Sequence, residues 1–296
     1  MSAFTISIVV GQDKASSTVR VDGSVEHLIT DEERLTFGLS ESQLKEAIAK
    51  YHNLEGALLP DGAYLRDPTP PHGELYRQYD WSQSQTQTTL VASSAEILDI
   101  TSEKEVVSNY TFQNAGKEHT SGLTVQHEKT NTVSTTWNNV SGLSVEQNIQ
   151  YNISSLGSWP GASGGEPTFS YSISWGEDGL KSEAFASGAL SVELPHKNNV
   201  SVTVSKLKTI MKVRIRYTAS LKVGSGAVMY YRNGYQEHNV WRSPLQKLMV
   251  VSSIPNSIET TQDIDIEHHS CTTIEIRDMK TQELISTHYF PKSVAV

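Results

Sequence analysis

Apolar and polar residues alternate along most of this chain, from about residue 85 nearly to its end. Such alternation is typical of half-buried β-strands. Between residues 123 and 153 the apolar side chains keep to odd positions, as at Leu123, Val133 and Tyr151. An unbroken path of about 30 residues at roughly 3.3 Å each would span about 100 Å. The pattern predicts an elongated β-domain, and several short sandwich strands joined by tight turns are the alternative.

The second half of the chain continues the alternation. Val200, Val202 and Val204 occupy even positions, and the apolar stripe moves to odd positions from Val213 onward. A change of phase inside a strand is typical of a β-bulge, which we therefore expect near residues 208–211. A last long strand is expected over residues 262–277.

The first 80 residues mix both patterns. Residues 4–10 and 18–21 are expected to be strands. A helix is predicted after Ser40, which is a good N-cap with Gln43 in capping-box position, and Gly56 would follow its end. A proline-rich break at residues 67–71 then ends this part. The predicted fold is mainly β, with a small α+β head at residues 1–80 that carries one clear helix and an elongated β-module at residues 81–296.

Composition narrows the possible partners. Hydrophobic residues make up 37% and charged residues 19% of the chain, both below the usual shares, so uncharged polar residues fill the difference. The net charge is −9 and no basic cluster occurs, which argues against a nucleic-acid partner. The single cysteine excludes an internal disulfide. No apolar run is long enough for a transmembrane helix, and the strand-like start lacks the basic region of a signal peptide.

Residues 141–177 carry the pattern with the clearest chemical meaning. Two amphipathic arms, at about residues 145–154 and 169–175, flank a Ser- and Gly-rich loop. A membrane-spanning β-strand needs about 9–11 residues, with one face toward lipid and the other toward a wet lumen. The predicted membrane-insertion residues are Val145, Ile149, Tyr151, Ile153, Trp159, Phe169, Tyr171, Ile173 and Trp175, and the predicted lumen face is Glu146, Asn148, Gln150, Asn152, Ser170, Ser172 and Ser174.

Two arms cannot span a bilayer alone, because their edge backbone groups would lie unpaired in hydrocarbon. Several copies would have to close into a barrel, so the hairpin implies an oligomeric pore. An ordinary sandwich hairpin is the alternative, since every half-exposed strand alternates. Gln147 interrupts the apolar stripe and favours that alternative.

Over about residues 80–296 the order of these features resembles the aerolysin-like β-pore-forming proteins, closest to the spherulin and follicular-yolk-protein-like branch. The amphipathic hairpin lies between long strands, as in that family. The other matching stretches are Tyr79-Asp80-Trp81 with residues 97–100, the Phe112-Gln113-Asn114 motif, and the Pro195 turn within residues 192–202. The sequence departs from the family in having His196 where a second proline is frequent.

The resemblance implies a β-pore-forming toxin or defence protein. A soluble monomer would bind a target-cell surface through a glycan or protein receptor, with residues 1–80 as the receptor-binding head. It would assemble into a homo-oligomeric ring and insert the hairpins of residues 141–177 as a transmembrane β-barrel, acting outside the cell that makes it. A non-lytic binding or storage protein, lectin-like or yolk-like, is the alternative on the same fold.

Two further groups of residues could carry chemistry. One face of the strand near the C-terminus would carry several potential metal-ligating or acid-sensitive groups, for which a solvated face is the favoured interpretation: Asp263, Asp265, Glu267, His269 and Cys271. An aromatic stretch with an arginine predicts a surface-binding loop, although a hairpin turn at Asn233–Gly234 explains it equally well: Tyr230, Tyr231, Arg232 and Tyr235. No catalytic motif occurs, so no enzyme, cofactor or metal is expected.

Overall fold

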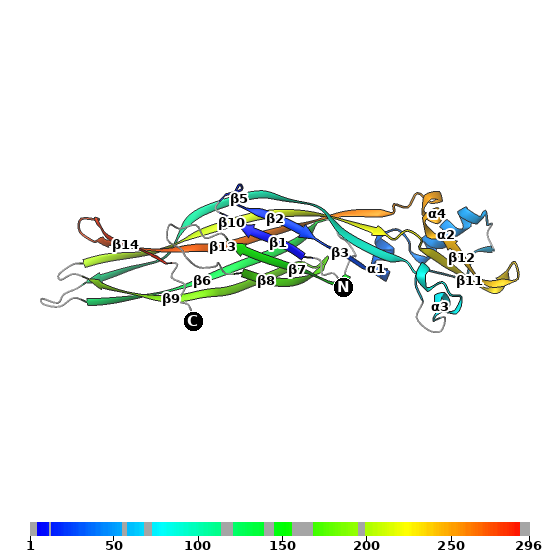
Figure 1. Ribbon diagram of the computed structural model, residues 1–296, viewed down its shortest axis with the longest axis horizontal. Coiled ribbons are helices and arrows are strands. Elements are labelled where there is room, and N and C mark those ends of the chain that lie inside the picture. Colours follow the sequence, from blue (N-terminus) through cyan, green and yellow to red (C-terminus); the bar gives the residue numbers. More distant parts are fainter. Residues whose placement is uncertain are drawn as a thin grey trace.

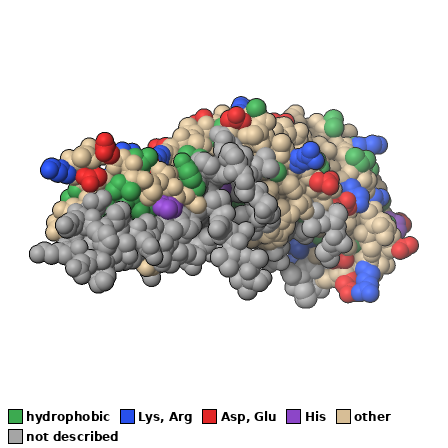
Figure 2. Space-filling view, turned by 60° about the vertical axis from the view of Figure 1, so that its left-hand side comes forward, with side chains coloured by type: hydrophobic (Ala, Val, Ile, Leu, Met, Phe, Trp, Pro, Cys, Tyr) green, Lys and Arg blue, Asp and Glu red, His purple; other side chains and the backbone are tan. Residues whose placement is uncertain are grey.

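The computed structural model describes residues 5–11, 13–54, 58–67, 73–113, 121–138, 145–155, 168–194 and 199–290. The molecule is elongated and mainly β, with long strands along its axis and a small helical head at one end (Figure 1). The predicted mainly-β, elongated fold is confirmed. In the described part of the face shown in Figure 2, single acidic and basic side chains are scattered over uncharged surface, as the composition predicts.

One sheet of long antiparallel strands forms the body, in the order β3–β5–β10–β13–β6–β9, with β14 beside β13. At 27 residues, β5 is about 90 Å long if fully extended. β13 pairs with β6 near its start and with β14 near its end. The strands are β3 (Ser24–Leu28), β5 (Gln87–Gln113), β6 (Ser121–Asn138), β9 (Gly179–Leu194), β10 (Asn199–Leu221), β13 (Ser257–Asp278) and β14 (Leu284–Phe290).

The phase change in β10 marks an irregularity in the sheet. The pairing of β10 with β13 shifts register between Leu207 and Lys208, which confirms the expected bulge. The expected last strand over residues 262–277 lies within β13. The continuous path predicted over residues 123–153 is wrong, because β6 ends at Asn138 and the next strand belongs to a different sheet.

A second, four-stranded sheet covers the middle of the body (Figure 1). Its strands, in spatial order, are β2 (Thr18–Asp22), β1 (Thr5–Val10), β7 (Val145–Ser155) and β8 (Thr168–Trp175). β1 pairs in parallel with β7, and the other two pairs are antiparallel. Ile6, Ile8 and Val10 of β1 are buried in the same core as the long strands.

The head combines two distant parts of the sequence. α1 (Asp31–Thr36), α2 (Glu41–His52), β4 (Gly62–Tyr64), α3 (Leu75–Gln78) and the short 3₁₀ helix Ser82–Ser84 come from the first part. β11 (Gly226–Tyr235), β12 (His238–Pro244) and α4 (Leu245–Val251) come from the segment between β10 and β13. A three-stranded sheet, β12–β11–β4, joins the two parts.

The structure therefore differs from the expected division at residue 80. β1 pairs with β7 and β3 pairs with β5, while β2 pairs with β1, so all three strands belong to the body and lie outside the head. The apolar stripe of β1 explains the difference, because an alternating strand must bury one face, and β7 offers it a free edge. The head instead takes β11, β12 and α4 from the second half of the chain.

The predicted helix is α2, and its start is as expected. The Ser40 hydroxyl accepts from the Gln43 backbone N–H, and the Gln43 side chain accepts from the Ser40 N–H. Its end differs, because Asn53 caps it in the left-handed conformation, with φ 52°. Gly56, the expected end marker, lies outside the described residues. None of the helices in the described part of the chain is long and apolar enough to cross a membrane.

Burial of β1 can be tested by truncating one side chain. Ile8 is fully buried between the two sheets, so we expect Ile8→Ala to lower the free energy of unfolding by about 2–5 kcal/mol, the cost of a large-to-small change in a core. Urea denaturation measures the change. Arg20→Ala, on the exposed side of neighbouring β2, is the control and should stay within about 0.5 kcal/mol of the wild type. Equal stability of the Ile8→Ala variant would contradict this packing.

Candidate functional site

β7 and β8 form the predicted amphipathic hairpin. Tyr151 lies opposite Tyr171, and their rings stack with centroids 4.8 Å apart. The register shifts between Val145 and Asn148, which is where Gln147 interrupts the apolar stripe in the sequence. The sequence irregularity therefore coincides with an irregularity in strand pairing.

The odd-numbered side chains of the hairpin face the long sheet. All of those that the structure describes are buried: Ile149, Tyr151, Ile153, Phe169, Tyr171, Ile173 and Trp175. They share one core with the inward side chains of β10, β13 and β6. The side chain of Val145 and the whole of Trp159 lie outside the described residues. The predicted membrane-insertion stripe is thus covered by the body of the same molecule.

The opposite face of the hairpin carries the predicted lumen residues, and it faces outward. Ser170 donates to Asn152 Oδ1 at 3.0 Å, and Ser172 donates to Gln150 Oε1 at 2.6 Å. Ser174 is half-buried on the same face. The side chains of Glu146 and Asn148 lie outside the described residues. Hydrogen bonds between outward side chains therefore join β7 to β8 on the polar face of the hairpin.

A buried polar group anchors the hairpin to the body. Gln262 Oε1 on β13 accepts hydrogen bonds from Tyr151 Oη of the hairpin at 2.6 Å and from Tyr217 Oη of β10 at 2.7 Å. Burial raises the pKa of both phenols, so both stay protonated donors. Gln262 Nε2 has no hydrogen-bond partner among the described residues. A buried donor without a partner lowers the stability of the folded state, so part of the stabilisation from these two hydrogen bonds is offset.

Aromatic rings surround the anchor. Trp137 of β6 lies 4.9 Å from the Tyr217 ring and 6.4 Å from the Trp175 ring of the hairpin, between centroids. Sequence reasoning did not single out Gln262, Tyr217 or Trp137 as partners of the hairpin. A signal was present for Gln262, because it shares a face with Ile264 and Ile266 and is the polar member of an apolar stripe.

The two edges of the hairpin are held differently. β1 pairs with β7 along the full length of β1, from Thr5 opposite Gln150 to Val10 opposite Ser155. On the β8 side, Lys181 Nζ donates to the Ser170 carbonyl at 2.8 Å and lies 4.9 Å from the centroid of the Phe169 ring. The β7 edge therefore has a continuous backbone ladder, and the β8 edge is held by a side chain.

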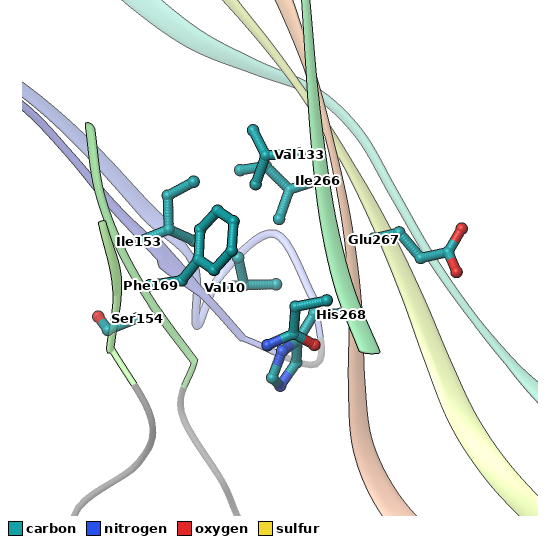
Figure 3. A pocket seen from close by; sticks show the side chains of 9 residues that line it. Val10, Val133, Ile153, Ser154, Phe169, Ile266, Glu267 and His268 are labelled. Carbon is teal, nitrogen blue, oxygen red and sulfur yellow. The ribbon is translucent and has the colours of Figure 1, made fainter. Parts of the chain in front are cut away.

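Packing is less complete where the hairpin approaches its loop. A cavity of about 10 Å³ separates Ile153 and Phe169 from the long sheet. Figure 3 shows both side chains pointing toward Val133 and Ile266, with His268 at the lower end of the cavity. A cavity of this size is close to the smallest that holds one water molecule.

The acidic face of β13 is occupied by ion pairs. Asp263 accepts two hydrogen bonds from Arg214, both at 2.7 Å. Glu267 pairs with Lys208 at 2.9 Å and lies 3.5 Å from His269 Nε2. The part of the chain that the structure describes contains no group of three metal-ligating side chains. The side chain of Cys271 lies outside that part. Asp263 and Glu267 are partly exposed and charge-paired, as expected of a solvated face, whereas His269 is buried against Thr130, so the solvated face ends before His269.

The aromatic stretch in the head packs largely on itself. Tyr231 is buried and stacks on Tyr235, with ring centroids 5.1 Å apart. Tyr230 is half-buried and Arg232 is exposed. The chain reverses at Gln236–Glu237, both at positive φ, and not at Asn233–Gly234. Of the predicted surface-binding residues, the structure places Arg232 fully at the surface.

Loss of the buried anchor should loosen the hairpin. Tyr151→Phe removes one donor to Gln262 and keeps the ring, so we expect it to lower the free energy of unfolding by about 0.5–1.5 kcal/mol. Amide hydrogen exchange should speed up across β7 in particular. Tyr110→Phe, at a half-exposed tyrosine of β5, is the matched control and should change neither quantity. Unchanged exchange in β7 after Tyr151→Phe would show that this hydrogen bond does not hold the hairpin.

The pair of Arg214 and Asp263 should make stability depend on pH. The hydrogen bonds that Arg214 donates to Asp263 lower the pKa of the Asp263 carboxyl in the folded state. Because the folded pKa is the lower one, this stabilisation is present above the unfolded value of about 3.9 and is lost as the pH falls through the folded pKa. Arg214→Gln should therefore lower the urea midpoint at neutral pH, and the difference from wild type should vanish in strong acid. Arg216→Gln, whose partner Glu96 lies 3.6 Å away in a more exposed pair, should have a smaller effect. A pH-independent difference would refute the linkage.

Comparisons with known proteins agree with this geometry. No protein-family model matches the chain. U-megalopygitoxin(8)-Mo15 of Megalopyge opercularis is 28% identical over 257 residues, which cover 85% of this chain and 77% of that protein. U-megalopygitoxin(8)-Mc8 of Megalopyge crispata is 26% identical over 255 residues, covering 85% of this chain and 83% of that protein.

Among solved structures, parasporin-2, a Bacillus thuringiensis toxin that recognizes cancer cells, superposes with a TM-score of 0.58 at 14% sequence identity. The superposition covers 91% of this chain and 98% of parasporin-2. At this identity the likeness concerns the fold. Long antiparallel strands, a helical head at one end and a hairpin packed on the middle of the body are all present here, and the chain shares the elongated, aerolysin-like fold of parasporin-2.

Proposed function

We propose that this protein is a β-pore-forming toxin whose β7–β8 hairpin inserts into a target membrane. The observation that carries the proposal is the hairpin itself, which buries an apolar stripe against the body and presents a polar stripe to water. β7 has 11 residues and β8 has 8, close to the roughly 9–11 that a membrane-spanning strand needs. The toxin names of the sequence relatives and the parasporin-2 fold support the same function.

Release of the hairpin would leave the long sheet intact. β6 precedes the hairpin in the chain and β9 follows it, and the two strands pair directly with each other up to Thr135 opposite Gly179. The hairpin adds no strand to that sheet, because its ladder partner is β1. It could therefore swing out once its contacts with β1 and the anchor at Gln262 are broken. Edge backbone groups in lipid must be paired, so hairpins from several copies would close into a barrel in a homo-oligomeric ring.

The head is proposed as the part that binds the target-cell surface. The head, which consists of the helices and the β12–β11–β4 sheet, lies at one end of the long axis (Figure 1). Its receptor would be a glycan or a protein on the outside of the target cell. No reaction is assigned to the protein, and we propose a non-enzymatic mode of action.

A non-lytic binding protein on the same fold is the second candidate. The observation in its favour is the anchor, in which Tyr151 and Tyr217 share one buried acceptor on Gln262. Release of the hairpin would break the hydrogen bond from Tyr151, and other interactions would have to offset this loss of free energy. A protein that never releases the hairpin would keep this arrangement at no functional cost.

Locking the hairpin to β1 tests the proposal. Ser7 and Asn152 are directly opposite in the parallel ladder, so Ser7→Cys with Asn152→Cys, made in a Cys271→Ser background, should form a disulfide that holds β7 on β1. We expect release of dye from loaded cells and liposomes by the background protein, no release by the oxidised double variant, and recovery after reduction.

The control for this experiment shares one of the two cysteines. Asn152→Cys with Ser170→Cys joins β7 to β8 across a directly opposite pair and leaves the hairpin free to move as a unit, so it should release dye when oxidised. Release by the oxidised Ser7–Asn152 variant would show that another segment inserts. Absence of release by the background protein from every target would favour the non-lytic candidate.

A further inference from the structure

A polar cavity of about 180 Å³ lies in the head, beside the turn by which β3 of the body leads into α1. One wall comes from the turn that follows β3 and from α1, and the other comes from the segment that follows β4. Ile29 and Leu65, both buried, form its apolar part. Thr86 fixes their backbones, because the Ile29 N–H donates to the Thr86 carbonyl at 3.0 Å and the Thr86 N–H donates to the Leu65 carbonyl at 2.7 Å.

Two charged side chains in this cavity are held in place by the protein. Arg34 donates from Nε to the Leu39 carbonyl at 2.5 Å and from Nη2 to the Ala63 carbonyl at 3.0 Å. Asp67 Oδ1 accepts from the Tyr76 N–H at 2.7 Å. Groups fixed before a ligand arrives lose little conformational entropy when it binds. The inner part of the cavity is therefore built before a ligand arrives, whereas Arg66 and Asp31 form its more exposed rim.

The charges lining the cavity balance. Arg34 and Arg66 contribute two guanidinium groups, and Asp31 and Asp67 contribute two carboxylates. Arg66 Nη2 lies 3.3 Å from Asp31 Oδ2. An anion would meet two carboxylates and a cation would meet two guanidinium groups, so neither has a net electrostatic advantage. Hydroxyl groups suit the lining better, because each one donates to a carboxylate and accepts from a guanidinium.

Size limits the ligand further. Pockets for drug-sized ligands usually have about 300–1,000 Å³, so 180 Å³ corresponds to a smaller molecule. A single sugar ring combines this size with several hydroxyls and an apolar face, which Ile29, Leu65 and the Tyr64 ring could cover.

We propose that this cavity binds one neutral monosaccharide unit, such as the terminal sugar of a cell-surface glycan. The inference deepens the proposed function, on which its biological meaning rests, by naming the chemistry of the receptor. It also moves the recognition site from the aromatic stretch at residues 230–235 to the part of the head beside α1.

Saturation-transfer NMR on the wild-type monomer tests the proposal with free glucose, galactose, mannose and N-acetylglucosamine at millimolar concentration, and with inorganic phosphate as a separate anion probe. We expect at least one sugar to bind, and Arg66→Gln and Asp31→Asn each to weaken it by about fivefold or more, as for one lost hydrogen bond. Arg34 is left unchanged because its hydrogen bonds to Leu39 and Ala63 support the fold. Arg77→Gln is the control, since Arg77 is an exposed arginine of the head that pairs with Glu74 outside the cavity, and this variant should bind sugar as the wild type does.

Three results would overturn the inference: no sugar binds, a sugar binds the Arg66→Gln and Asp31→Asn variants as tightly as the wild type, or phosphate competes with the sugar or binds in its place. Binding is measured on the monomer and requires no pore. If the protein releases dye and binds no sugar, only the proposed sugar site is overturned. If it binds sugar and releases no dye, only the proposed pore formation is overturned.

Discussion

Burial of the apolar stripe of the β7–β8 hairpin is the constraint on which the rest of the structure depends. The described part of the hairpin has seven buried side chains, each worth about 1.5–3 kcal/mol when removed from water, and exposing all of them to water would be costly. The long sheet supplies the surface that covers them, and β1 seals the edge of β7. The position of the N-terminal strands on the body, away from the head, follows from this requirement.

The same burial decides which contacts the proposed membrane insertion would have to break. Lipid can replace the apolar contacts of Ile149, Ile153 and Phe169, because hydrocarbon is as apolar as the core they leave. It cannot replace the hydrogen bond from Tyr151 to Gln262, or the backbone ladder between β1 and β7. These polar contacts therefore oppose release, whereas the unpaired Gln262 Nε2 and the small cavity beside His268 make the closed state less than optimal. The hairpin is therefore held on the body in water, and these two packing defects lower the free-energy cost of releasing it.

The outward faces of the long strands are polar, which protects the protein from aggregation. Long strands with apolar outer faces would pair edge to edge and aggregate. Here the outward positions carry Ser, Thr, Asn and Gln together with ion pairs such as Arg214 with Asp263. The low content of both charged and hydrophobic residues is thus the composition of long strands that bury one face only.

Local pattern in the sequence was enough to predict the alternation of β1, β10 and β13, the α2 capping box, the bulge in β10 and the amphipathic hairpin, because each depends on residues within a few positions of one another. Partners distant in sequence were decided by the tertiary structure alone. Alternation says that Ile6 and Ile8 face a core, but it does not say that the strand beside them is β7, about 145 residues later. The same holds for Gln262 beneath Tyr151, for the head assembled from two segments, and for the cavity between Arg34 and Asp67. In each case the contact is made by side chains whose proximity depends on how the sheets stack, and no local periodicity encodes that.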